Sequence, residues 1–284
     1  MDWTVKAPIL SLEKNYKFLP ITNQHHEAII KYCMSKDDSS LMEYLQDMLQ
    51  ELCLDGDIVI KELPFLDQLF LLIRLRSLCI GTRVEVIVEG EKNTKQKVPL
   101  VQCQKSINEH YIEPQQIKCE EVVWTLHYPA SWKPDVFSSY IYGVTIDDNN
   151  FRVNDLDPQQ LDQLIDEIPR QHRRKIQKVV NQLNDSIGKM IFAKLPDTHD
   201  DVYLHHHHYI HYIRILYSDT LSNFIELMYV FVKIINMSLS DVMKLTPSDT
   251  QVYYQMFVKE SIEKQKAQDQ SRNSNSSRNV PAKL

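Results

Sequence analysis

The sequence predicts an α+β fold in which N-terminal helices and a small antiparallel sheet pack on a buried helix, followed by an all-helical C-terminal half. Three features lead to this prediction. Residues 64–80 form an apolar run of helical length, residues 82–128 alternate between apolar and polar side chains, and residues 151–265 carry apolar residues at helical spacing. We therefore expect an α+β module over 1–150, a helical module over 151–265 and a disordered tail over 266–284.

Two amphipathic helices are expected near the N-terminus, after an extended and irregular segment over 1–22. The first begins near Thr22, where apolar residues start to recur. The second is expected over Leu41–Cys53, after polar residues that can cap its N-terminus. Its apolar side chains share one face at intervals of three and four: Leu41, Tyr44, Leu45, Met48, Leu49 and Leu52.

The helix over 64–80 is apolar on nearly every side, which is typical of a helix that is buried. Pro64 suits its first position because no backbone N–H is needed there. One strand is predicted before this helix, over Asp57–Lys61, and another after it, over Thr82–Glu89. The apolar residues of the helix are Phe65, Leu66, Leu69, Phe70, Leu71, Leu72, Ile73, Leu75 and Leu78.

Three charged residues interrupt this apolar helix. Asp67 and Arg74 are seven residues apart and share one side, whereas Arg76 lies about 200° around the axis from Arg74, among apolar residues. One interpretation is a core helix whose arginines reach past its rim. The other is a helix packed between its own sheet and a partner subunit, with the charges facing that partner.

A small sheet is expected after this helix. Its strands are predicted over Thr82–Glu89, Val98–Cys103 and Glu121–Tyr128, and Phe137–Ile146 adds an edge strand rich in tyrosine. The alternation of apolar and polar residues indicates one solvated face, and we expect the helix over 64–80 to cover the other face.

The C-terminal half is expected to be helical. Asp157 can cap a helix that starts at Pro158, and Pro169 starts the next one. Further helices are predicted over Asp219–Asn236, Leu239–Leu245 and Pro247–Lys266. From Gln265 onward the chain is polar and without periodicity, which predicts the disordered tail.

The composition excludes several classes of function. The chain has 284 residues, of which 43% are hydrophobic and 25% charged, as in ordinary globular proteins. Five glycines and no phosphate-binding fingerprint argue against a nucleotide site, and a net charge of −6 argues against nucleic-acid binding. The five cysteines show no paired spacing, so neither a disulfide framework nor a zinc site is expected. The N-terminus does not resemble a secretion signal and no apolar run suits a membrane span, so folding in the cytosol is expected.

The run from His205 to His211 is the one segment that suggests a metal. On a helix, His207 and His211 are four residues apart, a spacing common among zinc ligands. The His-Glu-x-x-His pattern of a catalytic zinc site is absent, so exposed or subunit-contact histidines are the default interpretation. No nucleophile or cofactor site stands out elsewhere, and we expect no enzymatic activity and no cofactor. A metal-binding enzyme or regulator built on this cluster remains the alternative.

Aromatic residues are numerous, with fourteen tyrosines and three tryptophans. Many lie in two segments, Trp124–Tyr142 and Tyr203–Tyr217. Such residues contribute much of the energy at protein interfaces. Core packing explains them equally well, so both interpretations stay open.

The segment from Leu63 to Ser77 resembles the signature of the baseplate hub and tail assembly protein family of T-even-like contractile-tailed phages. It reads Leu-Pro-Phe-Leu-Asp over 63–67, Leu-Phe-Leu over 69–71 and Arg-x-Arg-Ser over 74–77, with a glycine nearby. Similarity also covers Phe18–Thr22 and the segment around Thr246-Pro247, so the resemblance touches most of residues 16–264. One departure is Gly81, which comes four residues after the serine, where the family has its glycine closer.

The resemblance implies a structural or chaperone-like component of a phage tail baseplate hub. Its partners would be other tail and hub proteins, with no nucleic acid, membrane or small-molecule substrate, and it would act in the host cytoplasm during assembly or in the virion tail. A host-interaction protein of viral origin is a lesser possibility. The residues expected to bind a partner are Phe65, Asp67, Arg74, Arg76 and Ser77, because this segment carries the signature.

Overall fold

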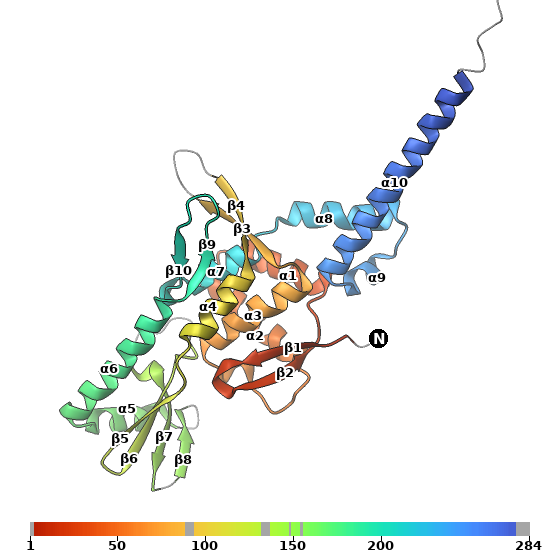
Figure 1. Ribbon diagram of the computed structural model, residues 1–284. Coiled ribbons are helices and arrows are strands. Elements are labelled where there is room, and N and C mark those ends of the chain that lie inside the picture. Colours follow the sequence, from red (N-terminus) through yellow and green to blue (C-terminus); the bar gives the residue numbers. More distant parts are fainter. Residues whose placement is uncertain (1–2, 89–93, 132–136, 148, 154–155, 277–284) are drawn as a thin grey trace, which may run out of the picture.

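A computed structural model describes residues 3–88, 94–131, 137–147, 149–153 and 156–276 (Figure 1). It confirms the predicted fold class, with N-terminal helices, small antiparallel sheets and a mainly helical C-terminal half. Helix α3 (Phe65–Cys79) lies near the centre of the body, and the last helix, α10 (Pro247–Ser276), projects away from it.

The N-terminal segment forms a hairpin that the sequence pattern did not indicate. Strand β1 (Val5–Ile9) pairs antiparallel with β2 (Lys14–Phe18) through the short 3-10 turn η1 (Leu10–Leu12). Two predicted helices follow, α1 (Asn23–Met34) and α2 (Asp38–Leu52). The carboxylate of Asp37 accepts the backbone N–H groups of Ser39 and Ser40, which fixes the start of α2.

The strand predicted over Asp57–Lys61 is wrong. Residues Ile60–Glu62 form a 3-10 turn, η2, instead. The reason is a side chain from α2: Gln50 accepts the N–H of Ile60 at 2.8 Å and donates to the carbonyl of Ile58 at 3.1 Å. This amide satisfies the backbone groups that a neighbouring strand would otherwise pair.

The predicted buried helix is α3 (Phe65–Cys79), preceded by Pro64. It packs against β1 on one side and against α4 (Leu100–His110) and α7 (Tyr209–Leu216) on others. A small antiparallel sheet therefore does pack on the buried helix, but that sheet is the N-terminal hairpin. The sheet expected from residues 82–128 does not cover α3.

Residues 82–152 divide into a hairpin, a helix and a four-stranded sheet. The hairpin joins β3 (Arg83–Val88) to β4 (Thr94–Pro99). The strand predicted over Val98–Cys103 is wrong beyond Pro99, because α4 (Leu100–His110) begins there and buries Leu100, Cys103 and Ile107 on one face. The sheet has the order β5-β6-β7-β8, with bounds β5 Gln115–Cys119, β6 Val122–Leu126, β7 Ile141–Ile146 and β8 Asn149–Arg152.

The strand predicted at the edge of the sheet lies inside it. The 3-10 turn η3 (Phe137–Tyr140) leads into β7, which pairs with β6 on one side and with β8 on the other. Helix α6 (Arg170–Ile187) packs against β5 and β6, so it covers this sheet in place of α3.

The C-terminal half contains the predicted helices and one further hairpin. As expected, Asp157 caps the helix that starts at Pro158, where its carboxylate accepts the N–H of Gln159 at 2.9 Å. The prediction of an all-helical C-terminal half did not include the hairpin of β9 and β10, which lies between α6 and α7. The elements are α5 (Pro158–Glu167), α6 (Arg170–Ile187), β9 (Ile191–Lys194), β10 (Asp201–Tyr203), η5 (His206–His208), α7 (Tyr209–Leu216), α8 (Leu221–Tyr229), the π-turn η6 (Val230–Ile234), α9 (Leu239–Lys244) and α10 (Pro247–Ser276).

Helix α10 continues to Ser276, past the predicted helix end at Lys266. Residues 266–276 include Lys266, Ala267, Gln268, Gln270 and Arg272, which are residue types that extend a helix at little cost. Residues 277–284 of the predicted tail lie outside the described residues. None of the helices in the described ranges is long and apolar enough to span a membrane.

Two clusters of buried apolar side chains hold the described residues together. The larger runs from Val5 to Tyr217 and includes nearly all of α3. The smaller one joins α1 to the C-terminal helices through Ile30, Phe224, Met228, Phe231 and Val242. The boundary expected near residue 150 stays a prediction.

Candidate functional site

The first residues of α3 face the interior of the chain. Phe65 is fully buried and its ring centroid lies 4.5 Å from that of Tyr209 on α7. Asp67 is also fully buried, and one of its carboxylate oxygens accepts the N–H of Ser11 at 3.2 Å. Burial raises the pKa of Asp67 to about 6, although Ser11 and the nearby hydroxyl of Tyr111 oppose this rise.

Asp67 belongs to a buried polar cluster that links four parts of the chain. The hydroxyl of Tyr111 lies 3.1 Å from Nε2 of His127, and the hydroxyl of Tyr128 lies 2.6 Å from Oγ of Ser186. The rings of Tyr111, His127 and Tyr128 contact one another, with centroids 5.1–5.7 Å apart. Burial lowers the pKa of His127 to about 4, so this imidazole is neutral at physiological pH.

Arg76, at the other end of α3, is 7% exposed. Its Nε donates to the carbonyl of Leu216, the last residue of α7, and its Nη1 donates to the carbonyl of Gly81. Burial lowers the pKa of Arg76, while Tyr217 and Asp219 favour its charged form. The guanidinium therefore stays charged and stabilises the carboxyl end of α7, where cations are favoured.

Arg74 and Ser77 are the predicted residues that solvent reaches in part. Both are half-buried. Nη1 of Arg74 donates to Oε1 of Gln104 on α4 at 3.3 Å. The structure thus places the five predicted residues on one helix, with Phe65, Asp67 and Arg76 facing internal partners and Arg74 and Ser77 nearer the surface.

A groove of about 650 Å³ opens beside Arg76, and we call it the C-terminal groove. One side of the groove, its floor, comes from α1, the end of α3 and the β3–β4 hairpin. The opposite wall comes from α8, η6 and the start of α10. At its base, Nε2 of His26 lies 3.2 Å from a carboxylate oxygen of Asp219. The lining residues are Asn23, His26, Arg76, Ile80, Gly81, Arg83, Lys97, Asp219, Asn223, Phe224, Glu226, Leu227, Val230, Pro247, Gln251 and Tyr254.

Hydrogen bonds from α1 hold the two walls of this groove together. Nδ2 of Asn23, which is buried, donates to the carbonyl of Val242 at 2.8 Å and to the hydroxyl of Thr250 at 2.6 Å. The interaction with His26 lowers the pKa of Asp219, which keeps this carboxylate ionised. The groove joins residues more than two hundred positions apart, so no sequence spacing could have revealed it.

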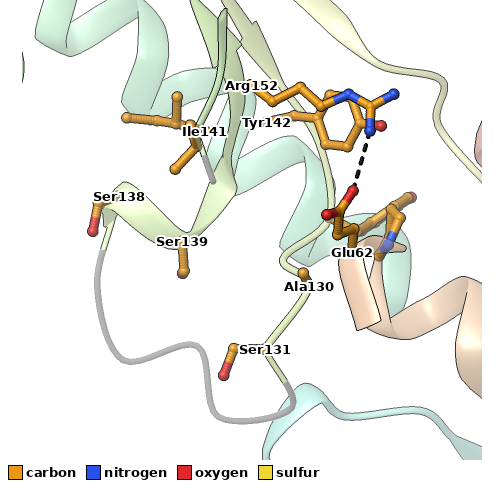
Figure 2. Close-up of a pocket in the computed structure, with 11 residues that line it drawn as sticks. Glu62, Ala130, Ser131, Ser138, Ser139, Ile141, Tyr142 and Arg152 are labelled. Carbon is orange, nitrogen blue, oxygen red and sulfur yellow. Dashed lines mark hydrogen bonds and ion pairs between the residues drawn. The ribbon is translucent and has the colours of Figure 1, made fainter. Parts of the chain in front are cut away.

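A second, smaller pocket of about 250 Å³ lies between η2 and the four-stranded sheet (Figure 2). Glu62 and Arg152 form an ion pair of 3.1 Å across one side of it. Ser131, Ser138 and Ser139 contribute hydroxyl groups, but no histidine, cysteine or lysine is among the described lining residues.

The histidine run is divided between a 3-10 turn and a helix. His205 precedes the turn η5, and His211 lies on α7, where neighbouring side chains such as Tyr212 turn inward. No group of three or more His, Cys, Asp or Glu side chains that could hold a metal occurs among the described residues. The metal-binding alternative therefore gains no support from the geometry.

Most of the described aromatic side chains in the two tyrosine-rich segments pack in the core. Trp124, Tyr128 and Tyr140 are buried in the first segment, as are Tyr209, Tyr212 and Tyr217 in the second. Tyr203 is an exception, with 42% of its surface exposed. Core packing is thus the better explanation for these residues.

Comparison with known proteins identifies one family. Residues 2–202 match the sequence model of a family described as T4 bacteriophage base plate protein. The matched range includes α3 and the floor of the C-terminal groove, whereas α7 to α10 lie beyond it. No curated protein and no solved structure gives a significant match.

Proposed function

The chain belongs to the T4 bacteriophage base plate protein family, and from this premise we propose that it serves the baseplate hub as a structural or chaperone-like component. It would act through contacts with other tail proteins. The observation that carries the proposal is the family match over residues 2–202, which includes the signature segment on α3. A place in the host cytoplasm during assembly is part of the same proposal.

We propose two roles for the five residues of α3. Arg74 and Ser77, which are half-buried, contact a neighbouring tail protein directly. Phe65, Asp67 and Arg76 support this contact indirectly, because their internal partners hold α3 in place. Charged residues at the rim of an interface fix orientation and partner choice more than they add affinity.

The proposal is tested by purifying the tagged chain from infected cells and identifying the proteins bound to it. Other tail proteins are expected. Mass spectrometry of purified virions then separates the two roles: a chain found in virions is a structural component, and one found only in assembly intermediates is an assembly factor. A chain found with tail proteins in neither sample contradicts the proposal.

The direct contact is tested with Arg74→Glu in a phage lacking the wild-type gene. Assembled tails are expected to decrease, while the circular dichroism spectrum of the purified variant stays unchanged. Lys105→Glu is the matched control, because Lys105 is an exposed cation on the neighbouring helix α4. Equal tail assembly in both variants would exclude Arg74 from the contact.

A further inference from the structure

The C-terminal groove carries cations that have no ion-pair partner among the described residues. Arg83 on β3 and Lys97 on β4 lie at its edge, and both are exposed. Arg76 lies at its base. Two acidic residues also line the groove: Asp219 contacts His26, and Glu226 accepts the hydroxyl of Ser222 at 3.4 Å.

The opposite wall of the groove carries most of its apolar side chains. Phe224, Leu227 and Val230 line it from α8 and the π-turn η6, and Tyr254 lines it from α10, beside the polar residues Asn223, Glu226 and Gln251. A groove with cations on one side and apolar side chains on the other suits a segment that is acidic on one side and apolar on the other.

The apolar wall continues along α10. Gln251 and Tyr254 line both the C-terminal groove and a second hollow of about 440 Å³ on α10. Tyr254, Val258 and Ile262 follow one another at intervals of four residues, and Ile262 is 48% exposed. Side chains at this interval form the ridge against which another helix packs. Figure 1 shows α10 projecting from the body, so this ridge is open to a partner.

Charge along the ridge has the same sign as in the groove. Lys259 and Lys266 flank the ridge, with Glu263 as the one acid in its lining. The groove and the ridge together present Arg76, Arg83, Lys97, Lys259 and Lys266 against Asp219, Glu226 and Glu263. This local excess of positive charge occurs on a chain whose net charge is −6.

We propose that the C-terminal groove and the adjoining face of α10 bind an acidic amphipathic helix of another tail protein. The tail origin of the partner rests on the proposed function, whereas the helix and its charge rest on the groove alone. Two other occupants fit less well. Residues 277–284 contain Arg278 and Lys283 and no acidic side chain, and the α10 of a second copy repeats Lys259 and Lys266.

The charge preference is tested with the full-length protein and a fluorescent designed peptide. The probe is a helical peptide with leucines at intervals of three and four and glutamates elsewhere, and its counterpart replaces every glutamate by lysine. Fluorescence anisotropy should show tighter binding of the acidic peptide, weakened by added salt. The double variant Arg83→Glu/Lys97→Glu should raise the Kd by about tenfold or more, as expected when interfacial charges are reversed.

Lys118→Glu is the matched control for this measurement, because Lys118 is an exposed strand lysine on β5, outside the groove. It should leave the Kd unchanged. Ile262→Glu should weaken binding if the ridge takes part, without affecting the fold, since this side chain is largely exposed. Equal binding of the acidic and basic peptides, or an equal effect of Lys118→Glu, would overturn the proposal.

Photocrosslinking during infection identifies the natural occupant. A crosslinking amino acid at position 254 should capture an acidic helical segment of a tail protein. A crosslink to residues 277–284 or to a second copy would overturn the proposed occupant. A crosslink to an acidic helix of a protein that is not part of the tail would contradict the proposed function and leave the groove assignment intact.

Discussion

In the buried polar cluster, the pKa values of two residues are shifted in opposite directions. Asp67 is raised from 3.8 to about 6, and His127 is lowered from 6.5 to about 4, both mainly by burial. Between pH 3.8 and about 6 the folded state holds the Asp67 proton more tightly, so this residue makes the free energy of unfolding fall as pH rises. Between about pH 4 and 6.5 the unfolded state binds the His127 proton more tightly than the folded state. This residue therefore makes the free energy of unfolding fall as pH falls.

We predict that single substitutions reveal these opposite slopes. Asp67→Asn removes the Asp67 contribution and keeps that of His127, which should raise the free energy of unfolding by about 3 kcal/mol from pH 4 to 6.5. His127→Gln removes the His127 contribution and keeps that of Asp67, which should lower the free energy of unfolding by a similar amount as pH rises from 4 to 6. Urea unfolding at several pH values measures both slopes. Slopes of the same sign in the two variants would contradict the assignment.

The sequence could identify Asp67 but not its surroundings. A carboxylate on an apolar helix is visible in the sequence as an anomaly, and a partner subunit was one reasonable explanation for it. Its actual neighbours, Ser11 and Tyr111, come from a hairpin turn and a helix end. The surroundings of Arg76 could not be predicted either. Its acceptors are backbone carbonyls, and a sequence pattern does not show which carbonyl groups will lie near a side chain.

At the scale of elements, α3 was the most predictable part of the chain because its signals agree. Pro64 precedes it, its apolar residues continue for four turns, and Gly81 follows it. Elsewhere a local pattern was compatible with two structures. Leu100, Cys103 and Ile107 have helical spacing, yet the preceding strand residues led to a strand prediction across Pro99. Near Ile60, a side chain distant in sequence replaced the strand partner.

We predict that the cost of truncating a side chain on α3 depends on how deeply that side chain is buried. Leu71→Ala should lower the free energy of unfolding by about 2–5 kcal/mol, because Leu71 is fully buried and its truncation leaves a cavity. Leu78→Ala, on the same helix at 38% exposure, should change it by less than about 1 kcal/mol. Denaturant unfolding monitored by circular dichroism measures both. Equal losses would show that α3 is not the centre of the core.

At the scale of the whole molecule, the end of the family match and the end of the main core do not coincide. The match ends at residue 202, but the larger apolar cluster includes Tyr209, Ile213 and Leu216 of α7. Helices α8 and α9 belong instead to the smaller cluster. Helix α7 therefore completes the structure that the matched residues begin, and α8 to α10 add one wall of the C-terminal groove.

This difference predicts where the chain can be shortened. A chain ending at Ser218 keeps the larger cluster and should unfold cooperatively, with some loss of stability because Ile30 and Asn23 lose their partners on the C-terminal helices. A chain ending at Val202 loses the ring of Tyr209 against Phe65 and the carbonyl of Leu216 that Arg76 binds. Removing these contacts leaves the Arg76 guanidinium with one of its two carbonyl acceptors, that of Gly81, which is destabilising.

We expect the chain ending at Val202 to lack a cooperative thermal transition by circular dichroism, while the chain ending at Ser218 retains one. A chain ending at residue 150 extends the series and tests the expected module boundary, since cooperative unfolding of that chain would support the boundary.

The acidic peptide should not bind the chain ending at Ser218, because the apolar wall from α8 and α10 is missing. If the chain ending at Val202 unfolds as cooperatively as the full-length protein, α7 is not part of the main core and the interpretation of Arg76 as its internal anchor is wrong.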